Sequence, residues 1–132
     1  MTIRILLVLL GLIHLSTGLW MLADPMGWYA AVPGVILTGP ANHHFISDIG
    51  LAFIASGAGL CFAIGAGLRN AVFALAGSTW PMLHALLHIY GWFAYGFPSD
   101  SRVAFAEVVG VVAVSVLGFV LAWTNARREG VF

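Results

Sequence analysis

The sequence predicts an all-α integral membrane protein, a four-helix bundle with both termini in the cytoplasm. Its composition is the first reason: 61% of the 132 residues are hydrophobic, only 8% are charged, and the mean hydropathy is +1.02. A soluble domain carries about 25% charged residues to cover its surface. The second reason is that the apolar residues fall into four runs of near-spanning length, since roughly 20 apolar residues cross a bilayer.

Each run is separated from the next by residues that end or begin helices. We expect four spans in one domain, residues 1–132, and place them at about 5–22, 45–67, 71–95 and 103–124. Asp24 followed by Pro25 ends the first span, and Asn42 is a candidate N-cap for the second. The connection 24–41 carries Trp28 and Tyr29, so we expect it to lie at the membrane interface, where such rings are favoured.

Arginine predicts the orientation. Arg4, Arg69 and the pair Arg127 and Arg128 fall on one side of the four spans, whereas the other side has only Arg102. By the positive-inside rule the arginine-rich side, with both termini, is cytoplasmic. We therefore expect a multi-pass protein, in bacteria of the inner membrane, whose 24–41 segment faces the periplasm.

Charge and cysteine content exclude two classes of function. A net charge of zero and a pI near 7 argue against a nucleic-acid partner, which requires a basic surface for the phosphates. Cys61 is the only cysteine, so an internal disulfide and a thiolate metal cluster are not expected.

Ionisable side chains inside the spans collect in the half of the bundle that faces outward. Such groups are costly in a membrane and usually mark a ligand site or a relay. Because the second and third spans are antiparallel, Asp48 is expected level with His88, with His44 and His84 within about one turn of them. His14 and Glu107 reach the same half from the first and fourth spans.

The spacing of these residues predicts a transition-metal site. His44 and Asp48 lie four residues apart, as do His84 and His88, so each pair shares one helix face. Two imidazoles one turn apart can bind a single ion. We expect His44, Asp48, His84 and His88 to be the ligands, with His14, Glu107 and His43 as additional ligands or as partners that orient the imidazoles.

Copper is the favoured metal because the site faces outward, with zinc and iron as alternatives. The protein would then be accessory to a larger membrane or redox system, with other membrane subunits or a second copy as partner. No catalytic residue is predicted, and whether the protein is an enzyme stays open.

Other functions fit the same residues. His14 with His84 or His88 can serve as axial ligands of a b-type haem. A non-catalytic structural or assembly subunit without metal is a further alternative, and so is a proton or substrate relay. Asp48 with His88, or Glu107 with Arg102, can also form ion pairs that only fix the packing of the helices.

Small and aromatic residues predict which faces turn inward. Gly11 and Gly18 share the face of His14, while Ala52 and Gly59 share that of Asp48. Further residues on these faces are Ser56 beyond Asp48, and Gly110 and Gly118 beyond Glu107. Trp80, Trp92 and Tyr95 are placed on the histidine face of the third span as core or interface aromatics. Pro81 is expected to kink that span and to free the carbonyl of Gly77.

The middle of the chain resembles a known family. The stretch Asp48-Ile49-Gly50-x-Ala52-Phe53-x-x-x-Gly57 and the turn Gly65–Arg69 look like the DoxX-like group of small four-helix membrane proteins. The resemblance implies a four-helix bundle and association with redox or other membrane partners. It carries over no motif for the histidines.

Overall fold

The computed structural model describes all 132 residues and contains helices but no strands. Four helical segments are long and apolar enough to cross a membrane: Thr2–Ala23, His43–Ile64, Leu68–Tyr95 and Ser101–Arg128. The predicted all-helical architecture with four long apolar helices is thus confirmed, with boundaries that differ from the predicted ones by a few residues, and it is compatible with a multi-pass membrane protein.

Nine helical elements make up these segments and their connections. They are α1 (Thr2–Ala23), α2 (Pro25–Ala31), the 3-10 helix η1 (Val35–Thr38), α3 (His43–Cys61), the 3-10 helix η2 (Phe62–Ile64), α4 (Leu68–Tyr95), α5 (Ser101–Phe105), the π-helix η3 (Ala106–Ala113) and α6 (Val114–Arg128). Asp24 ends α1 and caps α2, its Oδ1 accepting the Gly27 N–H at 2.9 Å. Asn42 caps α3 as predicted, its Oδ1 accepting the Phe45 N–H at 3.1 Å.

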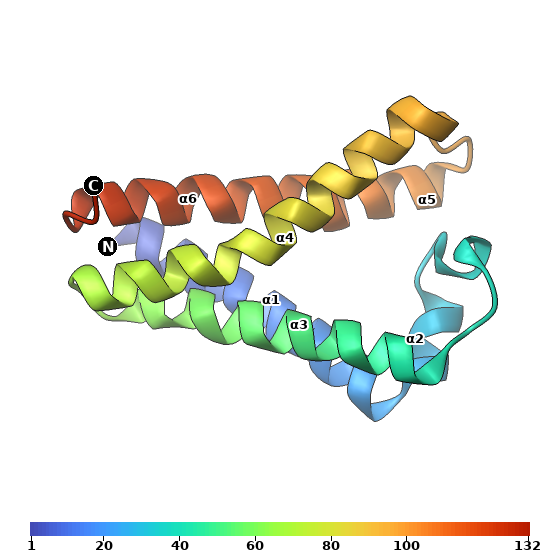
Figure 1. Ribbon diagram of the computed structural model, residues 1–132, viewed down its shortest axis with the longest axis horizontal. Coiled ribbons are helices and arrows are strands. Elements are labelled where there is room, and N and C mark those ends of the chain that lie inside the picture. The colour runs from blue at the N-terminus through green and yellow to red at the C-terminus, as the bar shows by residue number, and fades with distance from the viewer.

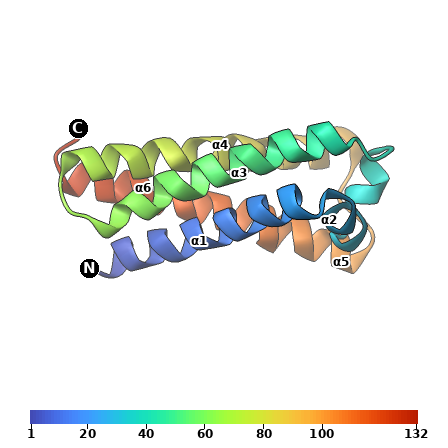
Figure 2. The same cartoon turned by 90° about the horizontal axis from the view of Figure 1, so that it is seen from below.

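The helices run along one common direction. Figures 1 and 2 show α1 beside α3, and α5 and α6 in line on the other side of the molecule. Both chain ends lie at the same end of the bundle, which we call the terminal end. The opposite end, formed by the segments 24–42 and 96–100, is called the loop end.

Glycines allow α1, α3 and α4 to approach closely. A Cβ atom at Gly57 of α3 would lie 2.6 Å from the carbonyl oxygen of Gly11 in α1, and a Cβ atom at Gly59 would lie 2.7 Å from the Cα of Gly77 in α4. Neither position has room for a side chain. The buried apolar core extends from these contacts toward the terminal end and consists of Leu7, Leu10, Leu60, Ala63, Ala74 and Ala122.

Pro81 lies inside α4, one turn after the contact with α3. Proline has no N–H to donate to the carbonyl of Gly77, and its ring crowds that carbonyl, so a helix bends there. Beyond this point α4 departs from α3 and runs toward α5 (Figure 1). In the second half of α4, His88 and Trp92 therefore contact η3, whereas His84, just beyond the proline, still packs against Phe53 of α3.

An ion pair closes the terminal end. Arg4 of α1 donates to Glu129, which follows α6, and the other carboxylate oxygen of Glu129 accepts the backbone N–H of Gly67 at 2.8 Å. These hydrogen bonds, with that from Arg4 the stronger, hold the pKa of Glu129 below its usual value. Glu129 thus joins the first helix, the turn before α4 and the end of the chain.

Candidate functional site

Glu107 accepts a hydrogen bond from one residue of α4 and lies beside another. Its Oε2 accepts the indole N–H of Trp92 at 2.5 Å and lies 3.6 Å from Nδ1 of His88. The side chains of His88 and Glu107 are only 26% and 23% exposed. A carboxylate within a span requires such partners, because no water is available in the hydrocarbon to replace them.

His84 extends this group toward the middle of the bundle. The rings of His84 and His88 are perpendicular, with centroids 4.9 Å apart, and Trp80 stacks on His84 with centroids 5.2 Å apart. The four residues from Trp80 to Trp92 recur every fourth position, so they share one face of α4. The predicted histidine face is therefore present; its Trp80 and His84 lie beside Phe53 of α3, and its His88 and Trp92 lie beside η3. We call His84, His88, Trp92 and Glu107 the His–Glu site.

Glu107 reaches α4 from an unusual helical segment. It is the second residue of η3, in which the backbone is π-helical rather than α-helical. Single π-helical turns occur frequently at functional sites. A π-helix also takes more residues per turn than an α-helix, which changes the face on which later residues lie. Gly110, predicted on the inward face with Glu107, is exposed as a result.

His14 is buried but belongs to a different environment. Its Nδ1 lies 2.8 Å from the carbonyl oxygen of Leu10, so this nitrogen donates within α1. Phe53 of α3 packs against His14, with ring centroids 5.6 Å apart, and also against His84, at 6.4 Å. A haem held between these two histidines would have to displace Phe53.

The predicted metal ligands are not brought together. His44 and Asp48 pair with each other, Nε2 to Oδ2 at 3.4 Å, and their side chains are 89% and 54% exposed. The expectation that Asp48 lies next to His88 is therefore wrong in this structure, since His88 faces Glu107 instead. Level residues of α3 and α4 meet only where the two helices stay adjacent: His84 still packs against Phe53 of α3, whereas His88, one turn further, faces Glu107 of η3.

The remaining candidates lie apart from the His–Glu site. His43, the first residue of α3, is exposed and unbonded through its ring. Arg102 pairs with Asp100 rather than with Glu107. Across the whole chain, no three His, Cys, Asp or Glu side chains gather in a group able to hold a metal ion.

Trp92 is the residue whose role the sequence did not reveal. It was assigned to the core or to an interface belt, yet its indole N–H is the shortest polar contact of Glu107. A signal existed in the sequence, because Trp92 follows His88 by four residues on the same face and its N–H needs an acceptor when it is buried.

Comparison with known proteins gives no relative: no family model, no curated protein and no solved structure matches this chain. The resemblance to the DoxX-like group stays a prediction.

Proposed function

We propose that the protein is a multi-pass protein of the bacterial inner membrane in which the His–Glu site takes up and releases a proton. The observation that carries this proposal is the contact between His88 and Glu107, Nδ1 to Oε2 at 3.6 Å, within a span. Imidazole is the side chain whose ordinary pKa lies closest to neutral pH. At 3.6 Å the imidazole and the carboxylate do not form a hydrogen bond, so transfer of a proton between them requires a small movement of one side chain or a bridging water.

The partners of the pair support proton transfer along α4. The Trp92 N–H can only donate, so it holds Oε2 of Glu107 in place without competing for the proton. His84 is the next titratable group, one turn away from His88. The order Glu107, His88, His84 is a short path from the second turn of the fourth span toward the middle of the bundle.

By the positive-inside rule the loop end faces the periplasm, so the exchange occurs with that side. Most of the chain lies in the four apolar helices, and this favours an accessory role beside other membrane subunits or a second copy of the chain. The proton relay would then serve a reaction or transport step of that assembly.

Proton release from protein reconstituted in vesicles tests the proposal. The measurement is the number of protons that each protein releases as the external pH is raised, read with a pH-sensitive dye outside the vesicles. Glu107→Gln keeps the shape of the side chain but removes the carboxylate that can bind a proton. We expect this variant to release fewer protons and the nitrogen-15 signals of His88 to change over the same pH range. Glu129→Gln at the terminal end is the matched control.

The relay would be contradicted if the Glu107→Gln protein released as many protons as the native protein and its His88 signals were unchanged. If Glu129→Gln reduced proton release and changed the His88 signals as Glu107→Gln does, the effects would reflect general damage to the protein. That result would also contradict the assignment to Glu107.

A second candidate is the predicted transition-metal site in an accessory subunit, with copper favoured and zinc or iron as alternatives. The observation in its favour is that the His84 and His88 rings lie side by side on one face of α4. The remaining ligands would have to come from a partner subunit, because no third His, Cys, Asp or Glu completes such a group within this chain. Elemental analysis of the native protein and of the His84→Ala/His88→Ala variant tests it. Absence of bound metal in the native protein rejects this candidate, and an absorption spectrum without a Soret band rejects the haem alternative.

A further inference from the structure

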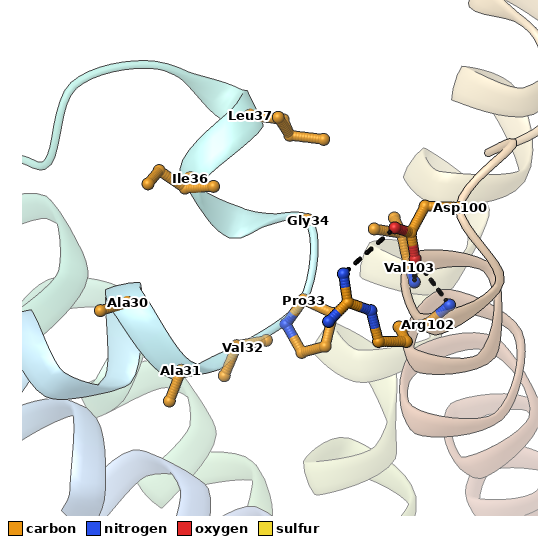
Figure 3. Close-up of a pocket in the computed structure, with 10 residues that line it drawn as sticks. All are labelled: Ala30, Ala31, Val32, Pro33, Gly34, Ile36, Leu37, Asp100, Arg102 and Val103. Carbon is orange, nitrogen blue, oxygen red and sulfur yellow. Dashed lines mark hydrogen bonds and ion pairs between the residues drawn. The ribbon is translucent and has the colours of Figure 1, made fainter.

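A groove opens at the loop end between the segment after α2 and the start of the fourth span. Its first part is a cavity of about 310 Å³, with Ile36 and Leu37 on one wall and Asp100 on the other. Its second part is a hollow of about 570 Å³ along α5 and η3. Pro33 and Arg102 line both parts, so the two parts adjoin there. Figure 3 shows the Arg102 side chain reaching from α5 toward Pro33.

The two parts differ in polarity. Asp100 and Arg102 are the only charged residues in the walls: Asp100 lines only the first part, and Arg102 lies where the two parts adjoin. The second part is otherwise lined by apolar residues and one serine, and among them are Phe105, Val109 and Gly110. The fourth span begins at Ser101, so the charged part lies where the lipid headgroups are, and the apolar part lies within the hydrocarbon.

The two charges retain the capacity to bind a ligand. Arg102 Nη2 lies 3.4 Å from Oδ2 of Asp100, and the side chains are 83% and 47% exposed, so the pair is weak. Oδ1 of Asp100 accepts the backbone N–H groups of Arg102, at 2.8 Å, and Val103, at 3.3 Å. The carboxylate is thereby held in position at the start of α5, with Oδ2 directed at the groove (Figure 3).

We propose that this groove binds a zwitterionic phospholipid of the phosphatidylethanolamine type. The phosphate pairs with Arg102, the ammonium pairs with Asp100, and one acyl chain follows η3 past Val109 and Gly110. A headgroup with both charges matches a wall with both charges, whereas an anionic headgroup satisfies Arg102 and repels Asp100. Gly110 leaves space for the chain, because no atom lies within 4 Å of the position a Cβ would take.

The test measures lipid retained by the purified full-length protein. Detergent-purified protein is titrated with phosphatidylethanolamine and the bound lipid is counted by native mass spectrometry. Arg102→Gln removes the phosphate partner, and Gly110→Leu fills the apolar part. We expect binding roughly tenfold weaker in each, as for the loss of a charge-assisted contact or of apolar fit.

Two variants serve as matched controls. Arg127→Gln removes an exposed arginine at the terminal end, and Ala113→Leu adds the same side chain to an exposed position of η3 outside the groove. Both should bind the lipid as the native protein does. If all the proteins retain equal lipid, the groove is not a specific site and the proposal fails.

Competition experiments with the native protein remain decisive even where a variant does not fold. We expect phosphatidylglycerol, which is anionic, to compete poorly for the site, and phosphoethanolamine without acyl chains to compete poorly as well. Equal competition by phosphatidylglycerol would overturn the role of Asp100. Equal competition by phosphoethanolamine would overturn the role of the apolar part.

Discussion

The hydrogen bond from Trp92 to Glu107 should contribute measurably to stability, and a double-mutant cycle can isolate it. Trp92→Phe keeps an aromatic ring and removes the N–H donor, while Glu107→Met keeps the length of the side chain and removes the acceptor. The bond is 2.5 Å long and joins a neutral donor to a carboxylate that is only 23% exposed.

The expected coupling energy follows from that geometry. Hydrogen bonds to charged groups contribute about 1.5–3 kcal/mol in soluble proteins. Polar contacts between membrane helices are weaker, at most about 1.7 kcal/mol in measured cycles, because the unfolded chain in a membrane also finds partners. We therefore expect a coupling of about 1–2 kcal/mol between Trp92 and Glu107.

Reversible unfolding in mixed micelles, followed by circular dichroism, provides the four stabilities of the cycle. Trp20→Phe combined with Glu107→Met is the control, since Trp20 is an exposed tryptophan of α1 with no hydrogen bond from its indole. Additive effects of the Trp92 and Glu107 substitutions, with no coupling beyond the control, would refute the reasoning that this bond holds η3 to α4.

Two further predictions concern the packing of the helices and the terminal end. Gly59→Leu should destabilise the protein by about 1–3 kcal/mol in the same unfolding assay, because the new Cβ meets the backbone of Gly77. Ala58→Leu, at an exposed position, is the control and should have little effect. The hydrogen bond from Arg4 lowers the pKa of Glu129. The Glu129 carboxylate therefore stabilises the folded protein above pH 4.5, its ordinary pKa, and this stabilisation is lost as the pH falls through the lowered pKa of the folded state. Unfolding measured against pH should show this acid-dependent loss in the native protein and a smaller one in Glu129→Gln; equal pH profiles would contradict it.

The sequence was sufficient for features that depend on local chemistry. Asp24 before Pro25 and Asn42 before the second span act through their own neighbouring backbone N–H groups, so their residue types already predict where helices begin and end. Likewise, Gly11 and Gly18 share a face with His14, and all three are buried against α3 or its neighbours. The helical period alone determines that arrangement.

The partner of His88 was beyond the sequence for a different reason. Equal depth along two antiparallel helices says which residues are level, but two level residues meet only if the helices stay adjacent and the side chains face each other. Asp48 fails on both counts, since it lies on an exposed face of α3 and α4 has left α3 beyond Pro81.

Pro81 and the π-helix act together on the His–Glu site. Proline was recognised as a kink, but a proline in a sequence does not state the direction in which the helix departs. No residue pattern predicts the π-helical backbone of η3, yet this backbone determines the face on which Glu107 lies. Because the bend takes His88 and Trp92 toward η3 and η3 turns Glu107 toward them, neither device alone would assemble the site. A straight α4 would place Trp92 away from η3 and leave the Glu107 carboxylate without its indole donor in the membrane. The charge of Glu107 can therefore be accommodated only because α4 bends.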